Sequence, residues 1–185
     1  MNPTENLILF LVLSVPVIIV SWRSLFSFRN HGFYRFFSWE CILWLFVCNY
    51  RYWFTYPFNL RQIIAWVLLI TAAYVVIAGV MKMKKAGKAQ KSRDEKELFA
   101  FEKTTELVDT GIFKYIRHPL YASLLYLTWG IFFKNTTIST FAVSVLSSVF
   151  LYITARFDEK ECTAYFGEKY REYMTRSKMF IPFVF

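Results

Sequence analysis

The chain has 185 residues, of which 56% are hydrophobic and 21% aromatic, including 21 Phe and 12 Tyr. That length suits one domain, and a soluble domain of this size would struggle to bury so much ring surface. The formal net charge is +9, but the Lys and Arg residues lie between apolar runs and form no continuous basic tract. This placement is typical of the cytoplasmic flanks of a membrane protein and argues against a nucleic-acid partner.

The first apolar run, residues 6–22, has no Lys or Arg before it and no small-residue cleavage pattern after it, which predicts a retained span rather than a signal peptide. The three cysteines, Cys41, Cys48 and Cys162, are too few and too scattered for a disulfide framework or a zinc site. The sequence therefore predicts no metal centre.

Five apolar runs follow one another along the chain, and a membrane-spanning helix needs about 20 largely apolar residues. The predicted spans are Leu7–Trp22, Phe37–Phe54, Ile63–Met81, Leu120–Phe133 and Ile138–Ala155. The last two are separated only by Lys134–Thr137 and are predicted to form a helical hairpin with a short first arm. The fold class is thus an all-α integral membrane protein with about five transmembrane helices and a cytoplasmic C-terminal helical segment.

The same pattern predicts a single membrane domain over residues 1–185. It consists of three N-terminal spans (1–81), a basic cytoplasmic connector (82–119), the helical hairpin (120–155) and a cytoplasmic C-terminal segment (156–185). With the N-terminus outside, 19 of the 22 Lys and Arg residues fall in cytoplasmic segments. The positive-inside rule therefore predicts an outer N-terminus and a cytoplasmic C-terminus.

One charged cluster, residues 109–121, precedes the hairpin and contains the motif Arg117-His118-Pro119. Proline disfavours helical geometry in the residue before it and suits the first turn of a helix, so His118 is predicted to be a non-helical corner. The start of the following helix carries unpaired N–H groups that can seat a carboxylate. Alternatively, Arg117 and His118 only anchor the helix among lipid headgroups.

A second charged cluster, residues 156–161, directly follows the last predicted span. Helical spacing places Glu159 on the same face as Ala155, Cys162 and Phe166, at the head of an otherwise apolar surface. Gly167 is predicted to end this helix. Alternatively, the segment is a solvated, salt-bridged helix at the membrane surface.

The hairpin returns the chain, so both clusters are predicted to lie at the same depth. One cluster offers helix-terminal amides and a cation, the other offers the carboxylates of Asp158 and Glu159, and Tyr115 and Tyr121 supply aromatic rings. Carboxylates and tyrosine faces can hold cationic groups, and the helix start can hold an anion. The combination favours a zwitterionic ligand with an additional positive centre.

Three segments in this order carry a family resemblance. They are Thr110–Tyr121 with its Arg-His-Pro motif, the acidic pair at 158 and 159, and a Phe-Gly-x-x-Tyr-x-x-Tyr pattern at 166–173. Over about residues 107–182 the chain resembles the isoprenylcysteine carboxyl methyltransferases, which are similar in turn to phospholipid N-methyltransferases. Where that family usually has a Glu-Glu pair, this chain has Asp158-Glu159.

The resemblance implies a pocket for S-adenosylmethionine. Cofactor-binding roles carry over to Tyr115, His118, Pro119, Tyr121, Asp158 and Glu159, and catalytic roles to Arg117 and Glu159. The implied reaction is an in-line methyl transfer that needs alignment and exclusion of water, and no metal. The implied partners are membrane lipids and a hydrophobic or lipid-like acceptor that enters from the membrane.

The nature of the acceptor stays open between a prenylcysteine carboxylate, a phospholipid amine, a small thiol and another hydrophobic molecule. The oligomeric state is open as well. Two other function classes are compatible with the sequence. One is a membrane reductase of the sterol-reductase type that uses NADPH, although such proteins generally have more spans. The other is a non-enzymatic membrane adaptor.

Overall fold

The computed structural model describes residues 3–26, 28, 30–86 and 106–184 of the chain. These residues form six α-helices and no β-strand, apart from one isolated bridge. The helices are α1 (Pro3–Ser21), α2 (His31–Asn49), α3 (Leu60–Ala86), α4 (Pro119–Phe132), α5 (Ile138–Phe166) and α6 (Glu168–Arg176). The prediction of an all-α protein is confirmed for the described residues.

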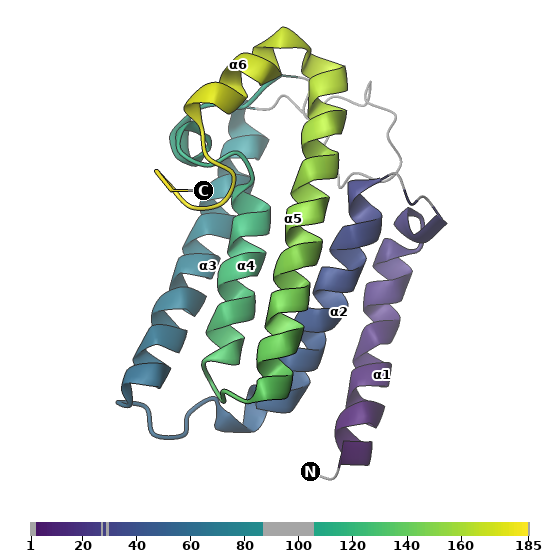
Figure 1. Cartoon of the computed structure of the whole chain (residues 1–185), viewed down its shortest axis with the longest axis vertical. Coiled ribbons are helices and arrows are strands. Elements are labelled where there is room, and N and C mark those ends of the chain that lie inside the picture. Colours follow the sequence, from purple (N-terminus) through teal and green to yellow (C-terminus); the bar gives the residue numbers. More distant parts are fainter. Residues whose placement is uncertain (1–2, 27, 29, 87–105, 185) are drawn as a thin grey trace.

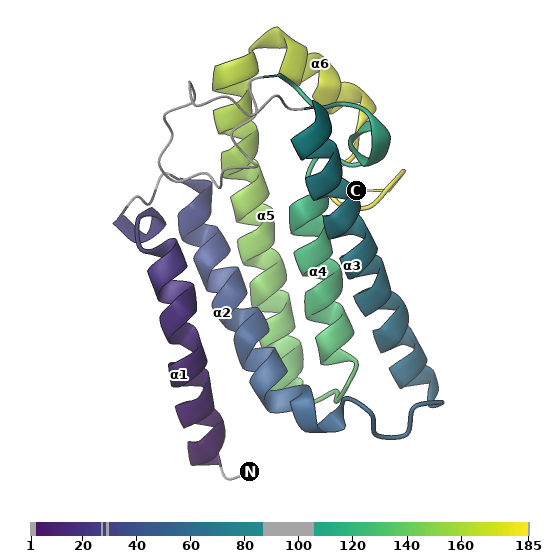
Figure 2. The same cartoon turned by 180° about the vertical axis from the view of Figure 1, so that it is seen from behind.

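Helices α1 to α5 lie side by side as an elongated bundle, and the short helix α6 lies across one end of it (Figure 1). Helix α2 packs mainly against α5, and α3 packs mainly against α4, while α1 lies at the edge of the bundle against α2 (Figure 2). Helices α4 and α5 form the predicted hairpin. We call the end of the bundle that carries α6 the α6 end, and the other end the hairpin end.

Three helices are long and apolar enough to cross a membrane, at Thr4–Ser21, Leu60–Lys85 and Ile138–Phe166. They correspond to three of the five predicted spans. Helix α4 is apolar but has only 14 residues, about 21 Å at 1.5 Å per residue. Helix α2 has 19 residues, but several of them are polar, and these polar residues lower its mean hydropathy. Their side chains are buried against neighbouring helices.

Several helices extend beyond the apolar runs that predicted them. Helix α2 begins at His31, because the Asn30 side chain accepts a hydrogen bond from the backbone N–H of Gly32 at 2.6 Å and caps the helix. Helix α5 continues past Ala155 to Phe166 without a break. An apolar run predicts only the part of a helix that suits lipid. Charged residues with good helix propensity can extend the same helix beyond that part.

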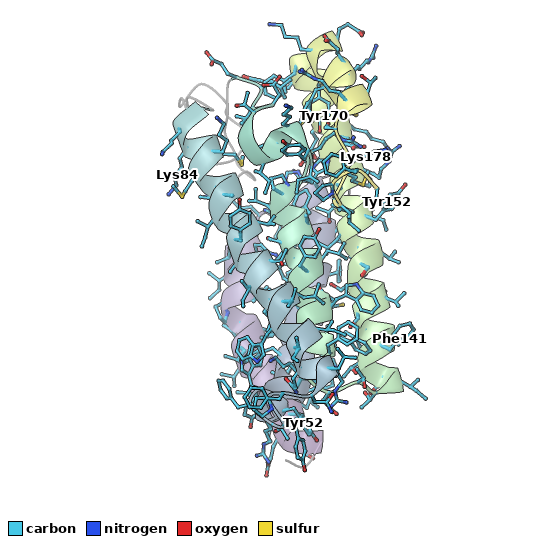
Figure 3. All side chains as sticks on the ribbon, turned by 90° about the vertical axis from the view of Figure 1, so that its left-hand side faces the viewer. Tyr52, Lys84, Phe141, Tyr152, Tyr170 and Lys178 are labelled. Atoms are coloured by element: carbon cyan, nitrogen blue, oxygen red, sulfur yellow. The ribbon has the colours of Figure 1, made fainter. Side chains whose placement is uncertain are left out.

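A buried cation closes the hairpin end, where Figure 3 labels Tyr52 and Phe141. Lys134, in the turn between α4 and α5, is fully buried, and its Nζ lies 3.7 Å from the ring centroid of Trp66. The same Nζ donates a hydrogen bond to Gln62 Oε1 at 3.1 Å. Lys134 therefore ties the turn to α3, since cation–π contacts strengthen when they are desolvated.

Candidate active site

The Arg-His-Pro motif forms a corner at the α6 end. His118 precedes α4 with φ −120° and ψ 64°, and Pro119 occupies the first turn of that helix, as predicted. The C-terminal segment runs alongside this corner. The backbone N–H of Arg117 donates to the Lys178 carbonyl at 2.7 Å, and that of His118 donates to the Met179 carbonyl at 3.2 Å. The corner is therefore held by residues that lie far along the chain.

Arg117 is the centre of a polar network that joins α5 to the C-terminal segment. Its guanidinium donates to Glu159 Oε1, with Nε at 2.9 Å, and it also donates to the backbone carbonyls of Met174 and Ser177. Glu159 is 4% exposed, and its other carboxylate oxygen accepts a hydrogen bond from Arg156 at 2.9 Å. Glu159 is thus a buried, paired carboxylate and not part of a solvated helix face.

His118 lies between the two acidic residues of α5. Its Nδ1 is 3.3 Å from Asp158 Oδ2, and its Nε2 is 3.5 Å from Glu159 Oε1. The imidazole stacks on the Tyr121 ring, with centroids 5.5 Å apart. Burial lowers the pKa of His118, but the hydrogen bonds and the negative charges of the two carboxylates outweigh burial and raise the pKa above its ordinary value.

A cavity lies against this network, with about 740 Å³ of empty space when the open solvent at its mouth is included. The lining residues come from α2 to α6 and from the segment before α4: His31, Met83, Leu107, Val108, Phe113, Arg117, His118, Pro119, Leu120, Tyr121, Asp158, Cys162, Phe166, Tyr170 and Tyr173. Tyr170 lies at the α6 end in Figure 3.

The cavity has one polar side and one apolar side. The apolar side is a packed cluster of Val108, Phe113, Tyr170 and Tyr173. Tyr173 is 2% exposed, and its hydroxyl donates to the Phe113 carbonyl at 2.6 Å, which joins α6 to the segment before α4. The apolar side of the cavity therefore joins two parts of the chain that are distant in sequence, α6 and the segment before α4.

The structure separates the predicted site residues into two groups. Five of them line the cavity: Arg117, His118, Pro119, Tyr121 and Asp158. Glu159 is not among the lining residues and contacts Arg117 and Arg156 instead. Tyr115 also lies outside the cavity lining; it is 45% exposed and its ring contacts Phe183.

His31 lines the cavity and was not identified from the sequence. It is the first residue of α2 and is 1% exposed. Its Nδ1 lies 2.7 Å from Glu161 Oε2, and its backbone N–H donates to Glu161 Oε1 at 3.1 Å. One signal in the sequence could have identified His31: the chain has two histidines, His31 and His118, and each lies a few residues before a predicted span.

His31, Asp158 and Glu161 could also hold a metal ion, since one ligand atom from each lies within 4.8 Å of the others. In the structure, however, His31 Nδ1 is hydrogen-bonded to Glu161, and Asp158 is paired with His118. The three residues therefore belong to two hydrogen-bonded or ion pairs, His31 with Glu161 and Asp158 with His118.

The comparisons with known proteins agree with the resemblance seen in the sequence. The family model for phospholipid methyltransferases matches residues 60–169, which is more than half of the chain. The chain therefore belongs to the phospholipid methyltransferase family, a family of membrane methyltransferases. No solved structure gives a significant match.

Two curated relatives are methanethiol S-methyltransferases. The one from Crocosphaera subtropica is 36% identical over 77 residues, which cover 40% of this chain and 28% of the relative. The one from Pseudomonas deceptionensis is 30% identical over 71 residues, which cover 38% of this chain and 26% of the relative. The aligned part thus spans roughly a quarter of each relative's length.

Proposed function

We propose that the protein transfers a methyl group from S-adenosylmethionine to a hydrophobic or lipid-like acceptor that enters from the membrane. The observation that carries this proposal is the cavity at the α6 end, where Asp158, Arg117 and the first turn of α4 converge. S-adenosylmethionine has a carboxylate, an amino group and a sulfonium centre, and the cavity offers a complementary group for each.

The first turn of α4 would bind the carboxylate, because its backbone N–H groups lack intrahelical partners and carry partial positive charge. Asp158 would bind the amino group, and the rings of Tyr121 and Tyr170 would lie against cationic parts of the cofactor. His118 lies at the wall of this cavity, with Asp158 and Glu159 on either side of its ring. Bound there, S-adenosylmethionine supplies the transferable methyl group.

Arg117 and Glu159, the predicted catalytic pair, have different roles in this proposal. Arg117 lines the cavity and supplies a positive charge at the corner. Glu159 acts through Arg117, because it fixes the guanidinium from outside the cavity lining. The names of the curated relatives favour a thiol among the acceptors left open by the sequence.

The test of the cofactor is thermal unfolding of the detergent-purified protein with added ligand. We expect S-adenosylhomocysteine, the product of the cofactor, to raise the free energy of unfolding by RT ln(1 + [L]/Kd), which is about 2.7 kcal/mol at a hundredfold excess over Kd. The melting temperature should rise accordingly. We expect NADPH to have no saturable effect. Stabilisation by NADPH alone would favour the reductase, and stabilisation by neither ligand would favour the adaptor.

We further propose that α1 to α5 all cross the membrane and that the α6 end is cytoplasmic. The N-terminus lies at the hairpin end and the C-terminus at the α6 end (Figure 1). Termini at opposite ends of the bundle are consistent with an odd number of membrane crossings. The presence of 19 of the 22 basic residues on the proposed cytoplasmic side supports this orientation. The single-domain division of residues 1–185 is part of this proposal, and residues 87–105 of its basic connector lie outside the described residues.

Single cysteines introduced into a version without native Cys test this topology. We expect a cysteine at the exposed position Lys169 to react with a membrane-impermeant maleimide only from the cytoplasmic side. A cysteine at the exposed position Thr136, in the hairpin turn, should react only from outside. Labelling of both positions from one side would contradict the hairpin crossing.

A further inference from the structure

The pairing of His31 with Glu161 assigns distinct roles to the two imidazole nitrogens. The Nδ1–Oε2 distance of 2.7 Å is that of a strong hydrogen bond to a carboxylate, so Nδ1 carries the donated proton. Glu161 is held in place, because its other oxygen accepts the His31 backbone N–H. In neutral imidazole this arrangement leaves Nε2 as the acceptor nitrogen.

His31 Nε2 is buried and has no hydrogen-bond partner among the described residues, while His31 itself lines the cavity. Burying such an atom unpaired costs about 1–3 kcal/mol, and a group bound in the cavity could remove that cost. His118 is less available to a substrate, because both of its ring nitrogens already face carboxylates, Nδ1 at 3.3 Å from Asp158 and Nε2 at 3.5 Å from Glu159. His31 also lies outside residues 60–169, the part of the chain that matches the family model.

We propose that His31 is the proton acceptor of the methyl transfer, positioned by Glu161, and that the acceptor substrate is a thiol. This inference rests on the proposed function. A carboxylate acceptor is already ionised at neutral pH and needs no base, whereas a thiol with a pKa of about 8.5, like a protonated amine, must first lose its proton. Between these two, the names of the curated relatives favour the thiol. The structure supplies a buried base of the kind that a thiol requires.

The step balances as follows. The Nε2 lone pair takes the proton from the S–H group, and the thiol sulfur forms a new bond to the methyl carbon. The bond between that carbon and the sulfonium sulfur breaks, and its electron pair stays on the departing sulfur, which becomes a neutral thioether. The charge that the sulfonium loses is carried by the protonated His31, which Glu161 stabilises and which then releases the proton to solvent.

The charged groups around His31 come from two elements. Burial and the charge of Arg35 on α2 lower the pKa of His31, but the hydrogen bond to Glu161 and the charges of Asp158 and Glu161 on α5 outweigh them and raise it above its ordinary value. The two carboxylates make Nε2 a better base than an isolated imidazole, and they stabilise the imidazolium that forms, as in other histidine–carboxylate pairs. A base on α2 also means that the spans before residue 60 contribute chemistry to the site.

The test compares two thiols of similar size, phenylmethanethiol, which is protonated at pH 7, and 4-nitrothiophenol, which is ionised at pH 7. In His31→Asn the amide NH₂ can replace Nδ1–H as donor to Glu161, but no group replaces Nε2. We expect this variant to lose about 10²- to 10⁴-fold in kcat/KM with phenylmethanethiol. With 4-nitrothiophenol the loss should be less than about threefold, and the affinity for S-adenosylhomocysteine should equal that of the wild type.

Lys160→Gln, an exposed change on the same helix as Glu161, is the control and should leave both rates unchanged. His31→Gln is the second variant, in case His31→Asn fails to fold. Equal losses with both thiols would assign His31 a merely structural role and overturn the proposal. Loss of wild-type activity on chelation, restored by Zn²⁺, would also overturn it in favour of a metal site.

Failure of the inference and failure of the proposed function give different results. If the wild type binds S-adenosylhomocysteine but methylates neither thiol, the thiol acceptor and the role of His31 are wrong, while the cofactor assignment stands. If the wild type binds no S-adenosylhomocysteine, the proposed function itself is wrong.

Discussion

Glu159→Gln should lower the free energy of unfolding by about 3–5 kcal/mol, because it leaves a buried guanidinium without its counter-charge. The Glu159 side chain is 5% exposed and that of Arg117 is 12% exposed, so water cannot replace the lost partner. For a chain of this size the change corresponds to a fall of roughly 10 °C in melting temperature. Thermal unfolding of the ligand-free protein in detergent measures it.

Arg156→Ala is the matched control, since Arg156 pairs with the same carboxylate but its side chain is 54% exposed. An exposed ion pair contributes only about 0–1 kcal/mol, so this variant should melt within a few degrees of the wild type. A double-mutant cycle of Glu159→Gln with Arg117→Met isolates the pair. A coupling energy below about 0.5 kcal/mol would mean that the two charges do not depend on each other, contrary to the geometry.

Asp158→Asn should have the largest effect on cofactor affinity of any single change in the cavity. Asp158 lines the cavity, and its side chain is 23% exposed, whereas Glu159 lies outside the cavity lining. A charge-assisted hydrogen bond contributes about 1.5–3 kcal/mol, which is roughly 10- to 100-fold in affinity. Calorimetric titration of S-adenosylhomocysteine into each purified variant measures the change.

Glu172→Gln removes an equivalent charge from an exposed position on α6 and should change the affinity less than about threefold. If Asp158→Asn binds as tightly as this control, the amino group of the cofactor does not contact Asp158. The two substitutions should therefore have different effects. Glu159→Gln should mainly lower the melting temperature, and Asp158→Asn should mainly lower the affinity for S-adenosylhomocysteine.

Much of the fold follows from the sequence, because lipid requires long apolar helices and leaves few alternatives. Each predicted run overlaps a helix, although α2 ends at Asn49 and not at the predicted Phe54. The corner at His118 and the helix end at Gly167 lie where proline and glycine predict them. Helix ends were less accurate, since capping by Asn30 extends α2 by several residues before Phe37. That extension brings His31 into the bundle.

The site was predictable only in part. The motif and the acidic pair were recognisable by type and order, and the hairpin brings them together. The sequence could not predict that Asp158 lines the cavity while Glu159 pairs with Arg117. Adjacent residues on a helix point in directions about 100° apart, so the outcome depends on how α5 is rotated toward Arg117. His31 was missed because its partner, Glu161, is 130 residues away in the chain.

The cavity is completed by residues that leave the ribosome after all five bundle helices. Arg117 depends on the carbonyl of Ser177, 60 residues later, and the backbone of residues 115–118 pairs with residues 178 and 179. On the proposed topology, a chain truncated before Ser177 would keep all five bundle helices but would lack the carbonyl that holds Arg117, so we expect it to lack a complete pocket.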